Sequence, residues 1–255
     1  MKDLFSLQGR TALVTGGSRG IGRMIATGLL SHGARVYLSS RKADACDQTA
    51  SELSALGPCF SLPADVSTVE GARGLAAAFA AREPALDILV NNAGAAWGES
   101  FNTFPEKGWD KVMDLNLKSP FFLTQALHEQ LKAAAKLRPA KVINVASIDG
   151  VSVNPLETYS YAASKAGLIH LIKRMSLRLV QDNIVVSGIA PGAFASEMNK
   201  VARDHEQETA RRIPAGRIGV AEDMAGVAIY LASRAGDYVV GQTIVVDGGV
   251  TLARG

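Results

Sequence analysis

The chain has 255 residues, 47% of them apolar and 20% charged, a composition typical of a soluble globular protein that encloses its own core. Its net charge of +3 and the lack of any cluster rich in lysine and arginine argue against a nucleic-acid partner. No stretch approaches the roughly 18 uninterrupted apolar residues of a membrane span, and the first residues lack a signal-peptide core, so we expect a cytoplasmic protein.

The cysteines and histidines form no metal-binding pattern. Cys46 and Cys59 make no CxxC pair, and the four histidines include no HExxH motif. We therefore expect no metal, and two ordinary thiols in a reducing compartment.

Short β-branched runs alternate with longer helical patterns along the chain. We expect strands at Thr11–Thr15, Arg35–Ser39, Cys59–Ala64, Ile88–Asn91, Val142–Ala146, Ile184–Ile189 and Thr243–Val246. We expect helices at Gly20–His32, Asp44–Leu56, Val69–Ala81, Trp109–Lys136, Tyr159–Gln181 and Ala221–Ala232. This alternation, with nearly continuous apolar strands, predicts an α/β fold whose parallel sheet is covered by helices on both faces.

No linker or internal repeat divides the chain, so we expect one domain over residues 1–255. The segment Ala193–Pro214 differs from the rest because it is polar and charged, with a weak helical pattern. It is either a substrate lid or a surface excursion with a helix of its own.

A glycine-rich turn follows the first expected strand. Gly16, Gly20 and Gly22 have the spacing GxxxGxG and lie where a strand passes into a helix. Glycines in that position allow the backbone to approach a pyrophosphate, and the helix N-terminus favours its negative charge. The turn has no Lys-Ser/Thr ending, which disfavours an ATP-binding P-loop. A purely structural turn is the alternative.

The second expected strand ends without the acidic residue that usually binds the ribose of NAD. Arg41 follows that strand instead, and Arg19 lies within the glycine turn. A guanidinium suits a 2′-phosphate because its planar fork matches phosphate oxygens. The pair therefore favours NADPH over NADH, although either arginine alone would be an ordinary surface charge.

Tyr161 and Lys165 lie four residues apart on an expected helix, and Ser147 precedes Tyr161 by fourteen residues. Residues at i and i+4 share a helix face, so the ammonium of Lys165 is expected to lower the pKa of the Tyr161 phenol. A phenol so tuned exchanges a proton with an alcohol or carbonyl oxygen. Taken alone the pair is equally an ordinary helix face. Tyr159 is a weaker candidate because its i+4 neighbour is Ala163.

Several motifs together resemble the short-chain dehydrogenase/reductase family. They are Thr15-Gly16-Gly17-Ser18-Arg19-Gly20-Ile21-Gly22, Asn91-Asn92-Ala93-Gly94, Asn116, Ser147, Tyr161-Ala162-Ala163-Ser164-Lys165 and Pro191-Gly192. The resemblance runs from about Gly9 to Gly249. It implies a single-domain, doubly wound Rossmann fold with seven strands, and a homotetramer.

The resemblance also implies NADP(H) as cofactor. The residues it assigns to that cofactor are Gly16, Ser18, Arg19, Gly20, Ile21, Gly22, Ser40, Arg41, Asp65, Val66, Asn92, Ala93, Gly94, Tyr161, Lys165, Pro191, Gly192 and Ser196. The chain departs from the family after Pro191-Gly192, where relatives often carry Thr. Ser196 is the hydroxyl available there.

The catalytic residues that the resemblance implies are Asn116, Ser147, Tyr161 and Lys165. Ser147 would hold the substrate carbonyl, and Tyr161 would donate a proton as hydride arrives. Lys165 would bind the nicotinamide ribose, and Asn116 would hold a water that reconnects Lys165 to solvent. Asn116 is alternatively a helix-bend residue, and Ser147 an N-cap or strand-end hydroxyl.

Within the family the chain is most similar to 3-oxoacyl-acyl-carrier-protein reductases, including those that feed rhamnolipid synthesis. The substrate implied is an acyl group presented by acyl-carrier protein. Arg138 lies at one docking position of such reductases, but the other is Asp182. This difference either weakens the carrier-protein interpretation or implies docking by other residues such as Arg203, Arg211 and Arg212, which are equally an ordinary solvated helix face. Phe194, Met198 and Val201 are either an acyl groove or packing residues. The alternatives are a reductase of a small polyol, ketose or cyclic ketone, and a catalytically silent NADP-binding regulator.

Overall fold

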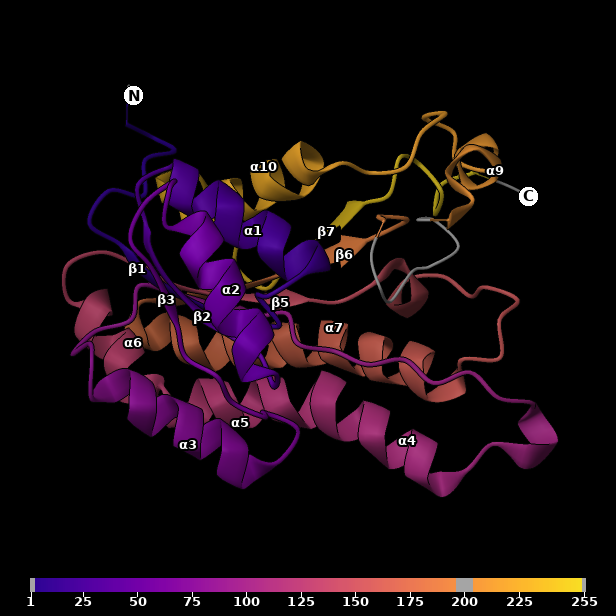
Figure 1. The fold of residues 1–255 in the computed structure, drawn as a ribbon, viewed down its shortest axis with the longest axis horizontal. Helices are drawn as coiled ribbons and strands as arrows, with labels where there is room; N and C mark the ends of the chain where they lie inside the picture. The colour runs from indigo at the N-terminus through magenta and orange to yellow at the C-terminus, as the bar shows by residue number, and fades with distance from the viewer. Residues whose placement is uncertain (1–2, 196–203, 254–255) are drawn as a thin grey trace.

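Within residues 3–195 and 204–253, which the computed structural model describes, seven parallel strands form one sheet in the order β3-β2-β1-β4-β5-β6-β7 (Figure 1). The strands are β1 (Thr11–Thr15), β2 (Arg35–Ser39), β3 (Cys59–Ser61), β4 (Ile88–Asn91), β5 (Ala140–Val145), β6 (Ile184–Pro191) and β7 (Thr243–Val246). Four of them have the predicted bounds. Of the other three, β3 ends earlier, before Pro63, β5 is shifted towards the N-terminus, and β6 continues to Pro191.

Helices cover both faces of the sheet. They are α1 (Gly20–Ser31), α2 (Ala43–Leu53), α3 (Val69–Ala80), α4 (Glu106–Met113), α5 (Ser119–Ala126), α6 (His128–Ala135), α7 (Tyr159–Leu179), α9 (Glu206–Arg211) and α10 (Ala221–Ala232). Figure 1 shows α1, α2 and α10 on one side, with α3 to α7 on the other. The predicted doubly wound Rossmann fold is confirmed.

Alternate residues of each strand enter two separate cores. Ala12 and Val14 of β1 pack with α1 and α10, whereas Leu13 packs on the opposite face with α3 and α5. Strands with both faces buried in this way tend to be continuous apolar runs, as Ile88–Val90 of β4 is, whereas β5 is equally buried but includes Lys141 and Asn144. The sheet is therefore the middle of three layers.

The expected helix Trp109–Lys136 is not continuous. Between α4 and α5 the segment η2 (Asp114–Lys118) is a π-helical turn, in which the Ser119 N–H donates to the carbonyl of Asp114. Pro120 explains the change, because it has no N–H to donate to the carbonyl of Asn116 one turn earlier. A wider turn at this position brings Asn116 into the protein, where it is 1% exposed.

The carboxyl ends of the strands lie at one edge of the sheet, at the right in Figure 1. The connections from β1 and β4 depart in opposite directions, because β2 lies on one side of this pair and β5 on the other. Such a switch point opens a crevice at the carboxyl edge, the usual ligand position in open α/β sheets. No helix among the described residues is long and apolar enough to cross a membrane.

Candidate active site

The glycine-rich turn lies at the carboxyl end of β1 and leads into α1. Gly16 and Gly20 have φ angles of 62° and 53°, a region that other residues rarely adopt. A Cβ on Gly22 would lie 2.2 Å from the Gly16 carbonyl oxygen, so the turn is closed against the helix. No side chain caps the first turn of α1 at Arg19, which leaves its N–H groups available to an anion.

Thr15 joins the two halves of the sheet at this edge. Its hydroxyl donates to the carbonyl of Val90 at 3.2 Å and accepts from the main-chain N–H groups of Asn92 and Ala93 at 3.0 and 3.1 Å. The amide of Asn92 donates in turn to the carbonyls of Thr15 and Gly16 at 2.9 and 3.1 Å. Sequence reasoning gave Thr15 no role, although it stands in the same motif as Gly16.

The residues expected at the adenine end follow β2 and β3. Arg19 and Arg41 are exposed, and neither guanidinium pairs with a carboxylate in the part of the chain that the structure describes. Asp65 accepts a hydrogen bond from the N–H of Ser67 at 3.0 Å, and Val66 is buried. Ser40 donates to the carbonyl of Lys42 at 3.2 Å. Two unpaired positive charges therefore remain at this end of the crevice.

Asn116 connects the loop after β4 with helix α7. Its Oδ1 accepts from the N–H of Ala95 at 2.8 Å, and its Nδ2 donates to the carbonyl of Ala95 at 2.9 Å. The same Nδ2 donates to the hydroxyl of Ser164 at 3.0 Å, and Ser164 donates to the carbonyl of Tyr161 at 2.7 Å. This chain fixes the first turn of α7. Ser164 was quoted in the motif without a role.

Ser147 and Tyr161 meet at the carboxyl end of β5. The hydroxyl of Ser147 accepts from the N–H of Asp149 at 3.1 Å and so caps the short helix η3 (Ile148–Gly150). It also interacts with the Tyr161 phenol. Burial raises the pKa of Tyr161 above its ordinary value, the Ser147 hydroxyl lowers it, and the charge of Asp149 adds to the rise.

Lys165 is 4% exposed and donates to the main-chain carbonyl of Val145 at 2.8 Å. Its Nζ lies 5.7 Å from the centroid of the Tyr161 ring. Burial lowers the pKa of Lys165 from its ordinary 10.5 to about 8. The expectation that Lys165 lowers the pKa of Tyr161 is therefore wrong for this structure: desolvation of the phenol dominates, and the ammonium is bonded to Val145.

The family model described as enoyl-(acyl carrier protein) reductase matches residues 16–251 of the chain. The rhamnolipids biosynthesis 3-oxoacyl-[acyl-carrier-protein] reductase of Pseudomonas aeruginosa is 48% identical, over 99% of this chain and 100% of that protein. The chain belongs to the short-chain dehydrogenase/reductase family. As a member of that family it is an oxidoreductase.

Relatives of this short-chain dehydrogenase/reductase differ in the substrates that their names give. The 2-dehydro-3-deoxy-D-gluconate 5-dehydrogenase of Escherichia coli is 40% identical over 98% of each chain. A solved structure of a Pseudomonas aeruginosa RhlG/NADP active-site complex superimposes with a TM-score of 0.94 at 47% identity, covering 98% of this chain and 99% of that one. The reaction class is thus clearer than the substrate.

In this oxidoreductase the segment that follows β6, residues 193–219, has its two ends side by side. Gly192 donates to the carbonyl of Val246 at 2.9 Å, and Gly219 donates to the carbonyl of Ala193 at 2.9 Å. Phe194 is buried against Gly219, so it packs the segment onto the body. Ser196, Met198, Val201 and Arg203 lie outside the described residues.

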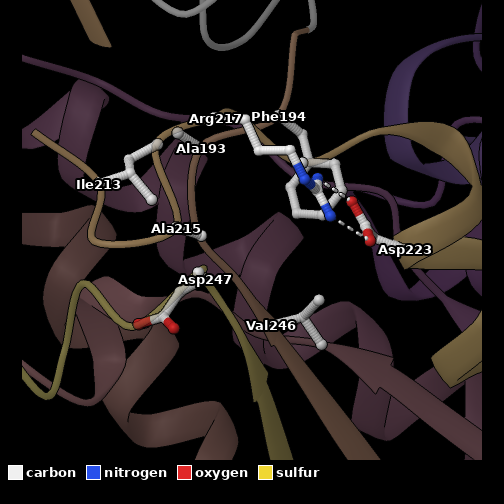
Figure 2. A pocket seen from close by; sticks show the side chains of 10 residues that line it. Ala193, Phe194, Ile213, Ala215, Arg217, Asp223, Val246 and Asp247 are labelled. Carbon is white, nitrogen blue, oxygen red and sulfur yellow. Dashed lines mark hydrogen bonds and ion pairs between the residues drawn. The ribbon is translucent and has the colours of Figure 1, made fainter. Parts of the chain in front are cut away.

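A cavity of about 180 Å³ lies beside this junction and is lined by residues that include Phe194, Ile213, Arg217 and Asp247 (Figure 2). Arg217 and Asp223 face each other at its rim, with N–O distances of 2.6 and 2.9 Å. The guanidinium lowers the pKa of Asp223 to about 2. This ion pair anchors the start of α10.

Two of the predicted docking arginines, Arg138 and Arg212, have partners within this chain. Arg138 donates to Asp87 at 3.3 Å and to the carbonyl of Gly9 at 2.6 Å, and Arg212 pairs with Glu208 at 2.8 Å. Asp182 pairs with Arg178, one turn earlier, at 2.6 Å. A positive charge therefore does lie beside the position that Asp182 occupies, on a side chain that is 54% exposed.

Proposed function

We propose that the protein reduces a 3-oxoacyl thioester, presented by acyl-carrier protein, to the 3-hydroxyacyl product with NADPH. The observation that carries the proposal is the meeting of Ser147, Tyr161 and Lys165 beside the glycine-rich turn, in a chain 48% identical along its length to a 3-oxoacyl reductase. Reductive biosynthesis of fatty acids or rhamnolipid-type lipids is the process that this reaction would serve.

NADP(H) fits the residues present at the expected site. Gly22 has no room for a Cβ, so the start of α1 lies close against the turn at Gly16, and the N-terminus of α1 is uncapped and available to a pyrophosphate. Arg19 and Arg41 offer two guanidinium groups for a 2′-phosphate that have no carboxylate partner among the described residues, and the solved relative with 47% identity is an NADP complex. The bound cofactor would supply the hydride.

The remaining chemistry falls to the protein's own groups. Ser147 would donate a hydrogen bond to the substrate carbonyl oxygen, and Tyr161 would donate the proton that completes the alcohol. A raised pKa keeps the phenol protonated at neutral pH, which is the form that reduction requires. Lys165 would bind the ribose hydroxyls, and Asn116 would hold the loop after β4 and α7 at a fixed separation.

A sugar-acid ketone is the second candidate substrate. The Escherichia coli gluconate-type dehydrogenase, at 40% identity over 98% of each chain, favours it. Both candidates use the same hydride and proton transfer, so the reacting groups do not distinguish them.

The test is NADPH oxidation with matched 3-oxoacyl-carrier, 3-oxoacyl-coenzyme A and sugar-acid ketone substrates, each repeated with NADH. We expect fast turnover of the thioesters with NADPH. Fast turnover of the sugar-acid ketones alone would replace the proposed substrate with the second candidate.

We further propose a cytoplasmic homotetramer with one domain over residues 1–255, in which residues 193–214 cover the substrate. Symmetric assembly is the common arrangement for oligomeric enzymes. Sedimentation that gives a monomer at micromolar concentration would contradict the assembly.

A further inference from the structure

Two loops at the carboxyl edge of the sheet carry apolar side chains in solvent. The first loop, residues 92–105, follows β4, and the second loop, residues 146–158, follows β5; both extend to the right in Figure 1. Phe101 of the first loop is 73% exposed, and Val153 and Leu156 of the second loop are 98% and 68% exposed. Exposed apolar side chains on neighbouring loops mark an interaction site when they form one patch.

Glu157 ties the two loops together. Its Oε1 accepts a hydrogen bond from the N–H of Phe101 at 3.1 Å and another from the hydroxyl of Tyr159 at 3.0 Å. Its main-chain carbonyl accepts from the N–H of Glu99 at 3.2 Å. One residue of the second loop therefore binds the first loop at two positions and the start of α7 at a third.

Aromatic packing reinforces the same junction. The ring of Tyr159 packs edge-on against Phe101 and Phe104, with centroid separations of 5.6 and 5.7 Å. Such pairs contribute beyond their buried area, and here they hold the tips of the first loop against α7. We call Phe101, Val151, Val153 and Leu156, together with Tyr159, the apolar rim.

The loops and helix that carry the apolar rim also carry the reacting groups. Ser147 lies at the start of the second loop, and Tyr161 lies in the first turn of α7, which Tyr159 begins. The first loop is held beside the same groups because Ala95 is bonded to Asn116 at both its N–H and its carbonyl. A substrate whose ketone meets Ser147 and Tyr161 would therefore extend along these loops.

The charges of the two loops select against an anionic substituent. Residues 92–105 and 146–158 contain no lysine, arginine or histidine, whereas they contain Glu99, Asp149 and Glu157. The residues of these loops would offer a sugar-acid carboxylate like charge and no cation, the ammonium of Lys111 over the Trp97 ring belonging to α4, whereas an alkyl chain would meet apolar surface. This difference favours the acyl substrate of the proposed function, on which the following inference rests.

We propose that Glu157 is a positioning residue that holds the two loops as one apolar rim, and that the rim binds the alkyl chain of the 3-oxoacyl substrate. The carboxylate itself makes no contact with the reacting atoms. The Glu157 carboxylate sets the separation of Phe101 from Leu156. That separation determines how much of the substrate's alkyl chain is removed from water when it binds.

The experiment compares two substrates, 3-oxobutanoyl-coenzyme A and 3-oxodecanoyl-coenzyme A, by their kcat/KM with NADPH. The wild-type protein should prefer the longer chain. Glu157→Ala should reduce that preference about tenfold, the value expected when roughly two methylene groups stay in water. The loss should lie in KM for the long substrate and not in kcat. Glu157→Gln should keep the preference within about twofold, because its amide oxygen still accepts from Phe101 and Tyr159.

A second variant makes the test independent of the loop junction. Leu156→Asp places a charge on the rim and should reduce the preference for the long chain by a similar factor. The matched control is Leu56→Asp, on the turn before β3, where the replaced leucine is 48% exposed and lies at the opposite edge of the sheet. It should leave the preference unchanged.

The outcomes separate the inference from the proposed function. Absence of turnover with either thioester overturns the proposed function and the acyl rim with it. Turnover of both thioesters without a chain-length preference, or with one that survives Glu157→Ala and Leu156→Asp, overturns the inference alone. A Leu156→Asp variant that changes sedimentation and not the preference assigns the rim to a contact between copies of the chain, and equally overturns it.

Discussion

The Nζ of Lys165 donates its hydrogen bond to the main-chain carbonyl of Val145, 2.8 Å away, and not to the phenol that stands four residues earlier on the same helix. The ammonium is therefore enclosed by protein between β5 and α7. Its partner Val145 is two residues before Ser147 in the chain. Burial of the ammonium lowers the pKa of Lys165 to about 8, which brings the loss of its charge into an accessible pH range.

This relationship predicts a pH dependence. Lys165 is charged below pH 8 and neutral above it, so kcat/KM for reduction should fall as pH rises through about 8. Lys165→Arg should be less active but should lose the fall at that pH, since a guanidinium keeps its charge. A profile of kcat/KM for the wild-type protein that is flat from pH 7 to about 9 would contradict the assignment.

The same shift has a consequence for stability. The unfolded chain binds more protons than the folded one between about pH 8 and 10.5, so the contribution of Lys165 to the free energy of unfolding rises with pH across that window. Urea unfolding of the wild-type protein should show this rise relative to Lys165→Met, which has no group to titrate.

Removal of the Tyr161 hydroxyl should separate binding from turnover. Tyr161→Phe keeps the ring, so NADPH affinity should stay near that of the wild-type protein, whereas kcat should fall by orders of magnitude because the proton donor is missing. Fluorescence titration and steady-state rates measure the two quantities. Tyr238→Phe is the matched control, because the side chain of Tyr238 is 99% exposed and takes no part in the site. Unchanged turnover in Tyr161→Phe would exclude Tyr161 as the acid.

Asn116 should matter for stability as well as for turnover. Asn116→Ala leaves the N–H and carbonyl of Ala95 without their partner, at a cost of about 1–3 kcal/mol for each group left buried. We expect a lower Tm and a lower kcat. Asn116→Asp keeps the acceptor for the Ala95 N–H but loses the donor to Ser164. Its Tm and kcat should therefore lie between those of Asn116→Ala and those of the wild-type protein. A variant with wild-type Tm would mean that water replaces these bonds.

The glycine turn predicts opposite effects for two glycine substitutions in helices. Gly22→Ala places a Cβ 2.2 Å from the Gly16 carbonyl oxygen, which should cost about 2 kcal/mol and abolish NADPH binding. Gly226→Ala, in the exposed interior of α10 with no atom within 4 Å of the new Cβ, should be neutral or stabilising by up to about 1 kcal/mol. Thermal unfolding with and without NADPH compares the two variants.

The cationic end of the crevice predicts cofactor preference. Arg41→Glu should raise the KM for NADPH about tenfold or more, the loss expected for one charge-assisted hydrogen bond, and should change the KM for NADH much less. Arg234→Glu, an exposed arginine in the 3₁₀ turn η5 (Arg234–Gly236) after α10, is the control for a change in net charge. Equal effects of the two substitutions would remove Arg41 from the cofactor site.

The sequence predicts the sheet well, because strands such as Ile88–Asn91 are buried on both faces and their apolar runs end at clear turns. It fails at Trp109–Lys136, where a continuous helical pattern conceals the effect of Pro120 on the carboxyl side of Asn116. Helical periodicity measures which face is apolar, and it does not register the loss of a single main-chain donor.

The site shows the same division. Motifs identified the groups that meet at the carboxyl edge, since local spacing on α7 fixes Tyr161 relative to Lys165. The pKa of Tyr161 was predicted in the wrong direction, because desolvation depends on neighbours that are distant in sequence. Glu157 was not singled out for a similar reason: its partner Phe101 lies 56 residues away, and its sequence neighbourhood is that of an ordinary polar loop.

The hydroxyl of Thr15 has a consequence for how the chain acquires its site. Its partners Val90, Asn92 and Ala93 are 75 to 78 residues further along, so the first strand emerges during synthesis long before they do. Contacts of such separation form late in folding, after local helices. The glycine turn is thus complete only when the two halves of the sheet have docked, and recovery of nucleotide binding during refolding would time that docking step and not the initial collapse.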